Sequence, residues 1–531
     1  MARAEDVARD QELGPAYGRP PTGATTIWLE RVARLLAPAL VGAAAAVGGI
    51  QLGGLSNKRI VITLSALAIP VIALASRHAR RVFLFCWVVC LTYNRNYFIE
   101  ALGNNASYGL YWSPADVFLT LLFLHWAWDL AINKRPLRPL GSSVIPWMLP
   151  FACACLLSIV GADRMDWGFY EMARLLRIAL ILLYVRYNVR REEWLVCAVA
   201  FGATILIQSS MGIPYVLTGQ RIGLASLLGA EQQLSAVKRV LDDLGPGGGL
   251  RAEGTLGHPN VFAVYLLLTG PLFLSLAAAA PLRRSVRAAC AAIGLLALAS
   301  IGVTLSRTSW AIASAQLLVL AVGFPALGLV RAKRAIGATV LVASLAIVCV
   351  MPFSGAIQRR FENFGQQIDY RSRHDRIAIE IWKGHPLVGV GLNEYSATLS
   401  TYDLPEIHVY NMLAEYIRKG IDIRVTAWVH NIYLLVLAET GAIGLASFLI
   451  FVVGALWIGV RAVASSHGAW RAASFGLLVG LLGLDVHGLQ EAALWIDPVT
   501  YTFALVVGLL ALVPALARGY PESRRRAAAE V

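Results

Sequence analysis

Charge is scarce in this chain, and that scarcity decides its class. Only 15% of the 531 residues are Asp, Glu, Lys or Arg, whereas 57% are hydrophobic. A soluble domain of this length has no means of burying so much apolar surface, so we expect a polytopic membrane protein. The net charge of +14 then reflects basic loops at the membrane surface, and nucleic acid is not expected as a partner.

Patterns that hold metals are also missing. All seven cysteines lie in apolar segments, and none has the spacing of a zinc or iron–sulfur site. No Asp-x-Asp motif or other carboxylate cluster suggests a bound cation, so neither a metal nor a cofactor is expected. The first residues lack the apolar core of a signal peptide and read as a cytoplasmic tail.

Apolar segments of about 20 residues, the length that crosses the hydrocarbon of a bilayer, recur along the chain. They predict an all-α polytopic membrane protein with about 14 transmembrane helices (12–14) and two long, partly helical periplasmic loops. The predicted spans are about 35–55, 60–76, 82–100, 114–132, 144–161, 169–185, 194–213, 258–280, 288–305, 308–330, 335–352, 431–460, 472–490 and 498–517.

Lys and Arg are concentrated in every second connection between these spans. Because basic loops stay in the cytoplasm, this alternation predicts that both termini are cytoplasmic and that both long loops face the outside. The basic groups are Arg77/Arg80/Arg81, Lys134/Arg135/Arg138, Arg186/Arg190/Arg191, Arg283/Arg284/Arg287, Arg331/Lys333/Arg334, Arg461/Arg471 and Arg524/Arg525/Arg526.

The resulting organisation has seven parts. These are a cytoplasmic tail (1–34), an N-terminal transmembrane bundle (35–213), a first periplasmic loop (214–257), central transmembrane helices (258–352), a large periplasmic loop (353–429), C-terminal transmembrane helices (430–517) and a second cytoplasmic tail (518–531). Hydrophobic periodicity and capping residues predict helices in the loops at about Glu231–Leu244, Arg373–Lys383 and Asp403–Gly420.

Two arginines lie inside the predicted span 169–185. Arg174 and Arg177 are three residues apart and share a helix face. An unpaired arginine at the centre of a membrane helix costs roughly 2.5–3.5 kcal/mol, so each needs a compensating partner. They either form an anion site inside the bundle, or extend to outer head groups, or pair with Glu171.

A third arginine, Arg307, lies in the short outer turn Ser306-Arg307-Thr308-Ser309. Its guanidinium, the hydroxyls and the free N–H groups of the next helix would form a phosphate-binding cradle. The alternative is a plain helix cap with a solvated arginine. In the second loop, Arg373 and Arg376 share one helix face and either bind substrate or form a solvated charged face.

Two histidines mark the outer ends of predicted spans. His258, in Gly257-His258-Pro259-Asn260, either binds a hydroxyl or carboxylate or caps the helix that follows. His430 and Asn431 stand where the large loop meets the membrane, and His430 is the candidate catalytic residue. Gly441 and Gly444 follow on the same helix and predict close packing against a neighbouring helix.

Several of these features occur in a fixed order along the chain. Ser306-Arg307 comes first, followed by Arg376 with Trp382, His385-Pro386-Leu387, Gly389-Val390-Gly391-Leu392-Asn393, and then His430-Asn431 and, after nine intervening residues, Gly441-Ala442-Ile443-Gly444. Over about residues 250–460 this pattern resembles the O-antigen ligase and O-antigen polymerase superfamily, which comprises bacterial membrane proteins of polysaccharide assembly.

The resemblance implies transfer of a glycan from an undecaprenyl-diphosphate donor at the periplasmic face of the inner membrane. His430 matches the catalytic histidine, Arg307 the diphosphate-binding arginine, and Arg376 or Arg373 the loop arginine. The acceptor is either the lipid A–core, for a ligase, or another lipid-linked glycan, for a polymerase. The 14 predicted spans exceed the roughly 12 of the family's ligases, so an O-antigen or exopolysaccharide polymerase is preferred.

Chemistry supports the same reading. A sugar diphosphate is a good leaving group, so arginines for its charge and a histidine base for the acceptor hydroxyl suffice without metal, and direct attack predicts inversion. Partners are then the lipid-linked donor, the acceptor and membrane lipids, together with a chain-length regulator or assembly complex. A lipid-linked oligosaccharide flippase is the rival class, but the inverted repeats expected of a transporter are not evident.

Overall fold

The structure, a computed structural model, describes residues 78–93, 97–101, 109–132, 137, 139–219, 251–279, 281–351, 354–355, 358, 364–398 and 429–518. The chain divides into two compact units, residues 1–83 with 122–137 and residues 84–121 with 138–531. All contacts described below lie within the second unit.

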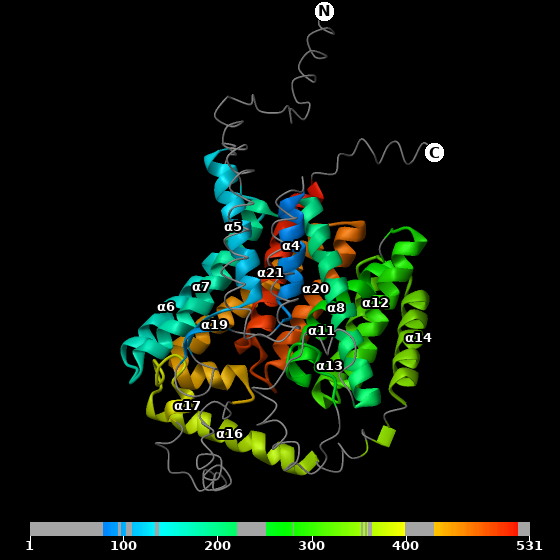
Figure 1. Cartoon of the computed structure of the whole chain (residues 1–531). Coiled ribbons are helices and arrows are strands. Elements are labelled where there is room, and N and C mark those ends of the chain that lie inside the picture. Colours follow the sequence, from blue (N-terminus) through cyan, green and yellow to red (C-terminus); the bar gives the residue numbers. More distant parts are fainter. Residues whose placement is uncertain are drawn as a thin grey trace, which may run out of the picture. The chain divides into compact units, whose positions relative to one another are not determined.

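The described elements, drawn in Figure 1, are α4 (Ala79–Cys90), β1 (Tyr97–Ala101), β2 (Gly109–Trp112), α5 (Pro114–Ala131), α6 (Ile145–Val160), α7 (Met165–Asn188), α8 (Arg191–Thr218), α11 (Pro259–Ala279), α12 (Arg284–Val303), α13 (Arg307–Ala326), α14 (Ala332–Val350), α16 (Phe364–Gly384), α17 (Tyr395–Thr398), α19 (Ile432–Ala464), α20 (Gly468–His487), the 3-10 helix η5 (Ala493–Trp495) and α21 (Asp497–Arg518).

Within these residues, seven helices are long and apolar enough to cross a membrane, namely α8, α11, α12, α13, α19, α20 and α21. A shorter apolar helix, α6, has 16 residues, and α7 has 24 residues but carries several charges. Most predicted spans end within a few residues of these helices. The predicted spans 35–55 and 60–76 lie outside the described residues, so the count of 14 stays a prediction.

One predicted span is wrong in its extent. Residues 82–100 were expected to form a single apolar helix, but α4 ends at Cys90 and Tyr97–Ala101 forms strand β1, which pairs antiparallel with β2. The polar sequence Asn94-Arg95-Asn96 interrupts the apolar run, and the aromatic and β-branched residues after it favour a strand.

Three helices form the buried centre of the second unit. In the most apolar stretch of each helix, 78%, 72% and 89% of the residues of α11, α20 and α21 are buried, whereas only 39% and 33% are buried in α12 and α13. α11 packs against α20, α12 and α13, and α21 packs against α7 and α19. The exposed apolar side chains of the outer helices are those expected to face lipid.

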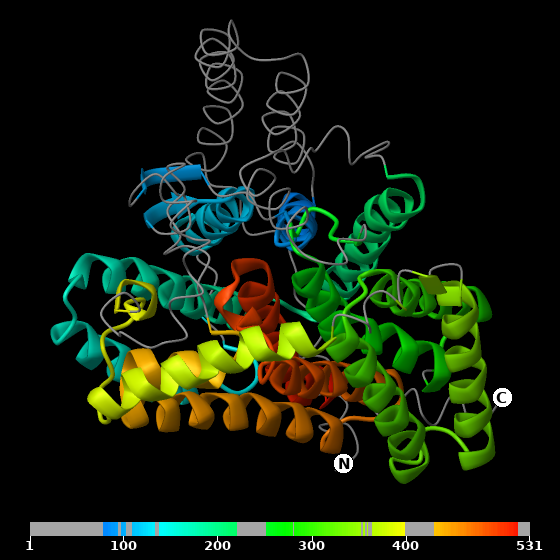
Figure 2. The ribbon, with the colours of Figure 1, turned by 90° about the horizontal axis from the view of Figure 1, so that it is seen from below.

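Helix α16 is not one of the apolar spans. It runs across one end of the helices in Figure 1 and lies alongside α19 in Figure 2, against which it packs. The sequence predicted a helix only at Arg373–Lys383, but the structure extends it from Phe364 to Gly384. The predicted helices at 231–244 and 403–420 lie outside the described residues.

The segment after α16 is locked into a break in α19. At Gly441 the backbone of α19 leaves the helical conformation, with φ 66° and ψ −169°. Amides of Ala442 and Ile443 donate to the carbonyls of Pro386 and Leu387 at 2.9 and 3.2 Å, so loop groups replace the missing helical bonds. We call this junction the α19 clamp. It fixes the first turns of α19, which follow His430, relative to α16.

Candidate functional site

Asn431 determines where α19 begins. Its side-chain oxygen accepts hydrogen bonds from the amides of Tyr433 and Leu434 at 3.0 and 3.2 Å, which is the N-cap arrangement. His430 comes directly before this N-cap residue, outside the helix, and its ring lies against Glu491 and His374. Its side chain is 24% exposed, so a ligand is able to reach the ring.

The nearest partner of His430 is a carboxylate from the connection after α20. Nδ1 of His430 lies 2.9 Å from Oε1 of Glu491, whose side chain is only 11% exposed. Burial alone would raise the pKa of Glu491, but the charges of His430, His258 and Arg371 and the His430 hydrogen bond hold the pKa of that carboxyl far below its usual range. An ionised carboxylate only accepts hydrogen bonds, so in the neutral His430 ring the proton lies on Nδ1 and Nε2 carries the lone pair.

Glu491 is also held by Asn260, which is held in turn by Arg251. Nδ2 of Asn260, at the start of α11, donates to Oε2 of Glu491 at 2.7 Å. Oδ1 of Asn260 accepts from Arg251 at 3.0 Å, and Arg251 also donates to the carbonyl of Thr304 at 2.7 Å. Arg251 thus donates to Asn260, Asn260 donates to Glu491, and Glu491 also accepts from Nδ1 of His430.

A basic side chain from α16 completes this surface. Arg371 lies 3.7 Å from Oε2 of Glu491 and donates to the backbone carbonyl of Gln490 at 2.9 Å. Its charge also acts on Arg307, at the start of α13. The Arg371 guanidinium, beside the carboxylate that holds the partly exposed His430, is suited to bind an anionic ligand.

His374, also on α16, borders His430. The two rings meet edge to face, with centroids 6.4 Å apart. Burial, and next the charge of His430, lower the pKa of His374 to about 4, so its ring is neutral near neutral pH. The hydroxyl of Tyr395 donates to the His374 carbonyl at 3.4 Å, which connects this part of α16 to the segment that forms the α19 clamp.

The turn before α13 has the form predicted from the sequence, with Ser306 as N-cap residue and Arg307 first in the helix. Ser309 donates to the Ser306 hydroxyl at 2.9 Å and lies 3.1 Å from Nε2 of His487, the last residue of α20. All three are buried, so they fix the start of α13 to the end of α20.

The other predicted site residues are spread over different places. His258 is exposed and its Nδ1 accepts from the Asn260 amide at 3.2 Å, so it caps α11, and its charge also acts on Glu491. Arg376 is exposed on α16. It lies five residues after Arg371, which places it about 140° around the helix. The side chain of Arg373 lies outside the described ones.

Arg174 and Arg177 are compensated by carboxylates. Arg174 contacts Glu171 at 3.1 Å and Asp497 at 3.0 Å, in line with the pairing that the sequence left open. Arg177 lies 3.5 Å from Asp116 and donates to the Tyr501 hydroxyl at 3.1 Å. These bonds join α7 to the start of α21 and to the start of α5. Their role as an anion site stays a prediction.

Sequence reasoning missed Glu491, Asn260 and Arg251, and it singled out other arginines than Arg371. Gln490-Glu491 is a short polar pair between two spans, where a carboxylate is ordinary. The predicted topology could have pointed to Glu491, because it places this residue on the same side of the membrane as His430. Asn260 was read as part of a helix start, which it is, but its side chain faces Glu491 instead of the backbone.

Comparison with known proteins agrees with the sequence pattern. Residues 291–449 match the family model described as O-Antigen ligase, which confirms the resemblance to the O-antigen ligase and polymerase superfamily. The matched region contains Arg307, Arg371 and His430, whereas Asn260 and Glu491 lie outside it. No curated protein matches the chain.

Proposed function

We propose that this protein is a metal-independent, inverting glycosyltransferase of the bacterial inner membrane, with its active site at the periplasmic face. It transfers a glycan from an undecaprenyl-diphosphate donor to a hydroxyl of an acceptor sugar. The observation that supports this most directly is the His430–Glu491 pair, 2.9 Å apart, at the start of a membrane helix. Of the two, His430 lies inside the matched family region. The family match supports a membrane enzyme of the ligase or polymerase type.

His430 serves as the general base in this proposal. Nε2 takes the proton of the acceptor hydroxyl while the acceptor oxygen attacks the anomeric carbon of the donor. The bond from that carbon to the diphosphate oxygen breaks, and undecaprenyl diphosphate leaves with the electron pair. Glu491 holds the Nδ1–H tautomer throughout and stabilises the imidazolium that forms. Attack opposite the leaving group inverts the anomeric configuration, so a retained configuration in the product would refute this step.

Arg307 and Arg371 stabilise the departing diphosphate. Their side chains come from α13 and α16, and the charge of Arg371 acts on Arg307, which supports a shared role toward one anionic ligand. Guanidinium groups bind phosphate oxygens through paired hydrogen bonds without a metal. Loss of one charge-stabilising donor costs about 10²–10³ in rate in comparable oxyanion sites.

The decisive test of catalysis is His430→Ala, with His467→Ala as the matched control, because His467 is an exposed histidine at the start of α20. Removal of the base is expected to lower kcat by about 10²–10⁴-fold while the donor KM changes little. The measurement is transfer from purified lipid-linked donor in proteoliposomes, with donor binding followed separately. An unaltered transfer rate in His430→Ala would exclude His430 as the base, whereas the absence of transfer in both wild type and variant would favour a transporter.

Two acceptors fit the same chemistry. The number of spans predicted from the sequence favours polymerisation onto another lipid-linked glycan, whereas the description of the matched family favours ligation onto the lipid A–core. The lipid-linked products of a deletion strain separate them. Core capped with single repeats indicates a lost polymerase, and long undecaprenyl-linked chains beside bare core indicate a lost ligase.

A further inference from the structure

A small pocket lies far along the chain from His430, where the end of α7 meets α21. The segment before α6 crosses this place with its backbone bonded to both helices. The Leu140 amide donates to the Arg186 carbonyl at 2.9 Å, and the Ser142 amide donates to the Ala511 carbonyl at 3.3 Å. Gly141 lies so close to α21 that a Cβ there would overlap the Ala511 backbone. The segment is therefore fixed, and it presents two serines beside Arg186.

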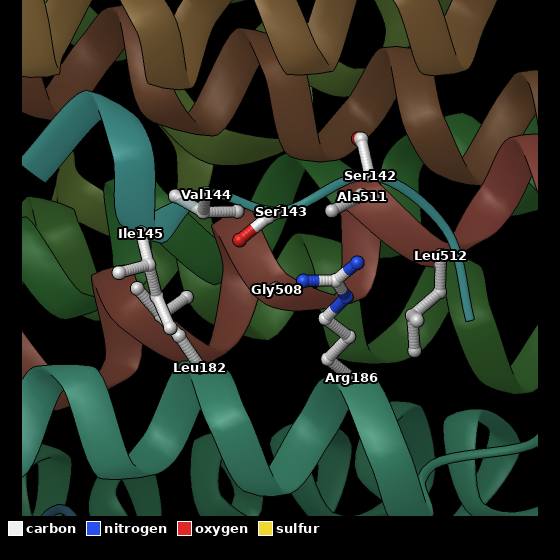
Figure 3. A pocket seen from close by; sticks show the side chains of 9 residues that line it. All are labelled: Ser142, Ser143, Val144, Ile145, Leu182, Arg186, Gly508, Ala511 and Leu512. Atoms are coloured by element: carbon white, nitrogen blue, oxygen red, sulfur yellow. The ribbon is translucent and has the colours of Figure 1, made fainter. Parts of the chain in front are cut away.

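The pocket is a shallow recess that encloses about 10 Å³, and the remaining space at its mouth is open to solvent. Figure 3 shows the Arg186 guanidinium and the Ser143 hydroxyl facing this space, while Leu182, Ile145 and Leu512 supply apolar walls. A cation and a hydroxyl at the mouth of an apolar recess at a helix end match a molecule with an anionic head and an apolar body.

Arg186 differs from the other two arginines of α7. Arg174 and Arg177 each contact carboxylates, at 3.0–3.5 Å. Among the residues that the structure describes, no carboxylate pairs with Arg186, and its Nε is buried without a hydrogen-bond partner. A half-buried guanidinium with an unused donor is costly in a membrane protein unless an anion from elsewhere meets it.

We propose that this pocket binds the phosphate group of an anionic membrane phospholipid. Arg186 contributes its planar set of N–H donors, which matches phosphate oxygens, and the Ser143 hydroxyl adds a further donor. The acyl chains then lie against the apolar wall and the lipid-facing surface. Arg186 belongs to the basic connections predicted to be cytoplasmic, which places the site on the leaflet opposite His430 and makes it independent of the proposed transfer reaction.

The test uses the full-length protein in detergent, titrated with a short-chain phosphatidylglycerol, with a diacylglycerol of the same chain length, or with inorganic phosphate. Native mass spectrometry counts bound lipids, and thermal unfolding gives the apparent affinity. We expect phosphatidylglycerol to bind and stabilise the protein while diacylglycerol does not. Arg186→Gln should lose one bound lipid and weaken its binding by about tenfold or more, since a hydrogen bond to a charged group is lost.

Arg284→Gln is the matched control, because Arg284 is an exposed arginine predicted to lie on the same side of the membrane. It should bind phosphatidylglycerol as the wild type does. Equal lipid counts and affinities in Arg186→Gln and wild type would overturn the proposal. Equal stabilisation by inorganic phosphate would overturn its lipid part and assign a free-anion site. If Arg186→Gln does not fold, Arg186→Lys and Ser143→Ala replace it, and unchanged affinity in both would also overturn the site.

Discussion

Replacement of Glu491 by Gln tests the proposed catalytic arrangement most sharply, because it keeps the shape of the side chain while it removes the negative charge and turns one acceptor into a donor. Asn260 donates to Oε2 of Glu491 at 2.7 Å, and its own oxygen accepts from Arg251 at 3.0 Å. In Glu491→Gln the oxygen of the new amide must therefore face Asn260, and the NH₂ group of that amide then faces Nδ1 of His430. That donor forces Nδ1 to be the acceptor, so the proton moves to Nε2 and the base is lost.

The size of the effect follows from the cost of the alternative. Both amides could rotate so that His430 keeps its tautomer, but Asn260 then loses its bond to the Arg251 guanidinium. A hydrogen bond to a charged group is worth about 1.5–3 kcal/mol, so the rotated arrangement is disfavoured by about 10–150-fold. We expect kcat to fall at least about tenfold by this argument, and by at most the 10²–10⁴-fold of a missing general base.

A second substitution should reverse the loss. In the double variant that adds Asn260→Asp to Glu491→Gln, the new carboxylate accepts both from Arg251 and from the NH₂ group of the introduced glutamine. The oxygen of that glutamine is then free to accept from Nδ1–H of His430, and kcat should partly recover. Steady-state transfer in proteoliposomes is the assay, and Glu380→Gln, in an exposed pair with Lys383, is the control. A kcat in Glu491→Gln that falls less than about tenfold, or a double variant slower than the single one, would refute the reasoning.

Three further predictions concern α16 and the α19 clamp. The pKa of His374 is about 4 in the folded protein and about 6.5 in the unfolded chain. The free energy of unfolding should therefore be highest above about pH 6.5 and lower by about 2 kcal/mol at about pH 5. Thermal unfolding measured against pH should depend less on pH in His374→Gln than in the wild type. Arg371→Gln should lower kcat by about 10²–10³-fold, and a larger loss in Arg376→Gln would instead make Arg376 the loop arginine. Gly441→Ala places a side chain at φ 66° against the Leu387 backbone and should cost about 1–3 kcal/mol in thermal unfolding, whereas Gly337→Ala in α14, where a Cβ meets nothing, should be neutral or stabilising.

Much of the membrane fold could be predicted because one variable, the length of an apolar run, determines most helix bounds. α11, α19 and α21 begin within a few residues of the predicted positions, since Pro259, Asn431 and Asp497 are ordinary helix-start residues. The prediction was wrong at residues 82–100, where hydrophobicity alone does not separate a helix from a short strand that is mostly apolar. Tyr97–Ala101, in which Glu100 is the one charged residue, has that composition.

Of the site, only the residues that are neighbours in the sequence, His430 and Asn431, could be predicted. His430 and Asn431 stand out because a polar pair at a membrane boundary is unusual, and the helix-start role of Asn431 follows from its position. Glu491 comes from an element 61 residues later, and its importance depends on which helix ends lie side by side. Such pairing is a property of tertiary packing, so no local pattern of the sequence carries it.

The glycines around His430 show how far the sequence interpretation had to change. Gly441 was expected to let α19 approach another helix, but the backbone that lies against it belongs to Leu387 and Val388, in the segment after α16. Gly389 makes the reciprocal contact with the backbone of Glu439. Because these contacts join backbones, they leave little freedom for either element to shift. Arg371 and His430 each lie outside the α19 clamp, on the two elements that it joins. Gly441, where α19 breaks, and Gly389, in the segment after α16, therefore help to set the separation between the base and the arginine proposed to meet the diphosphate.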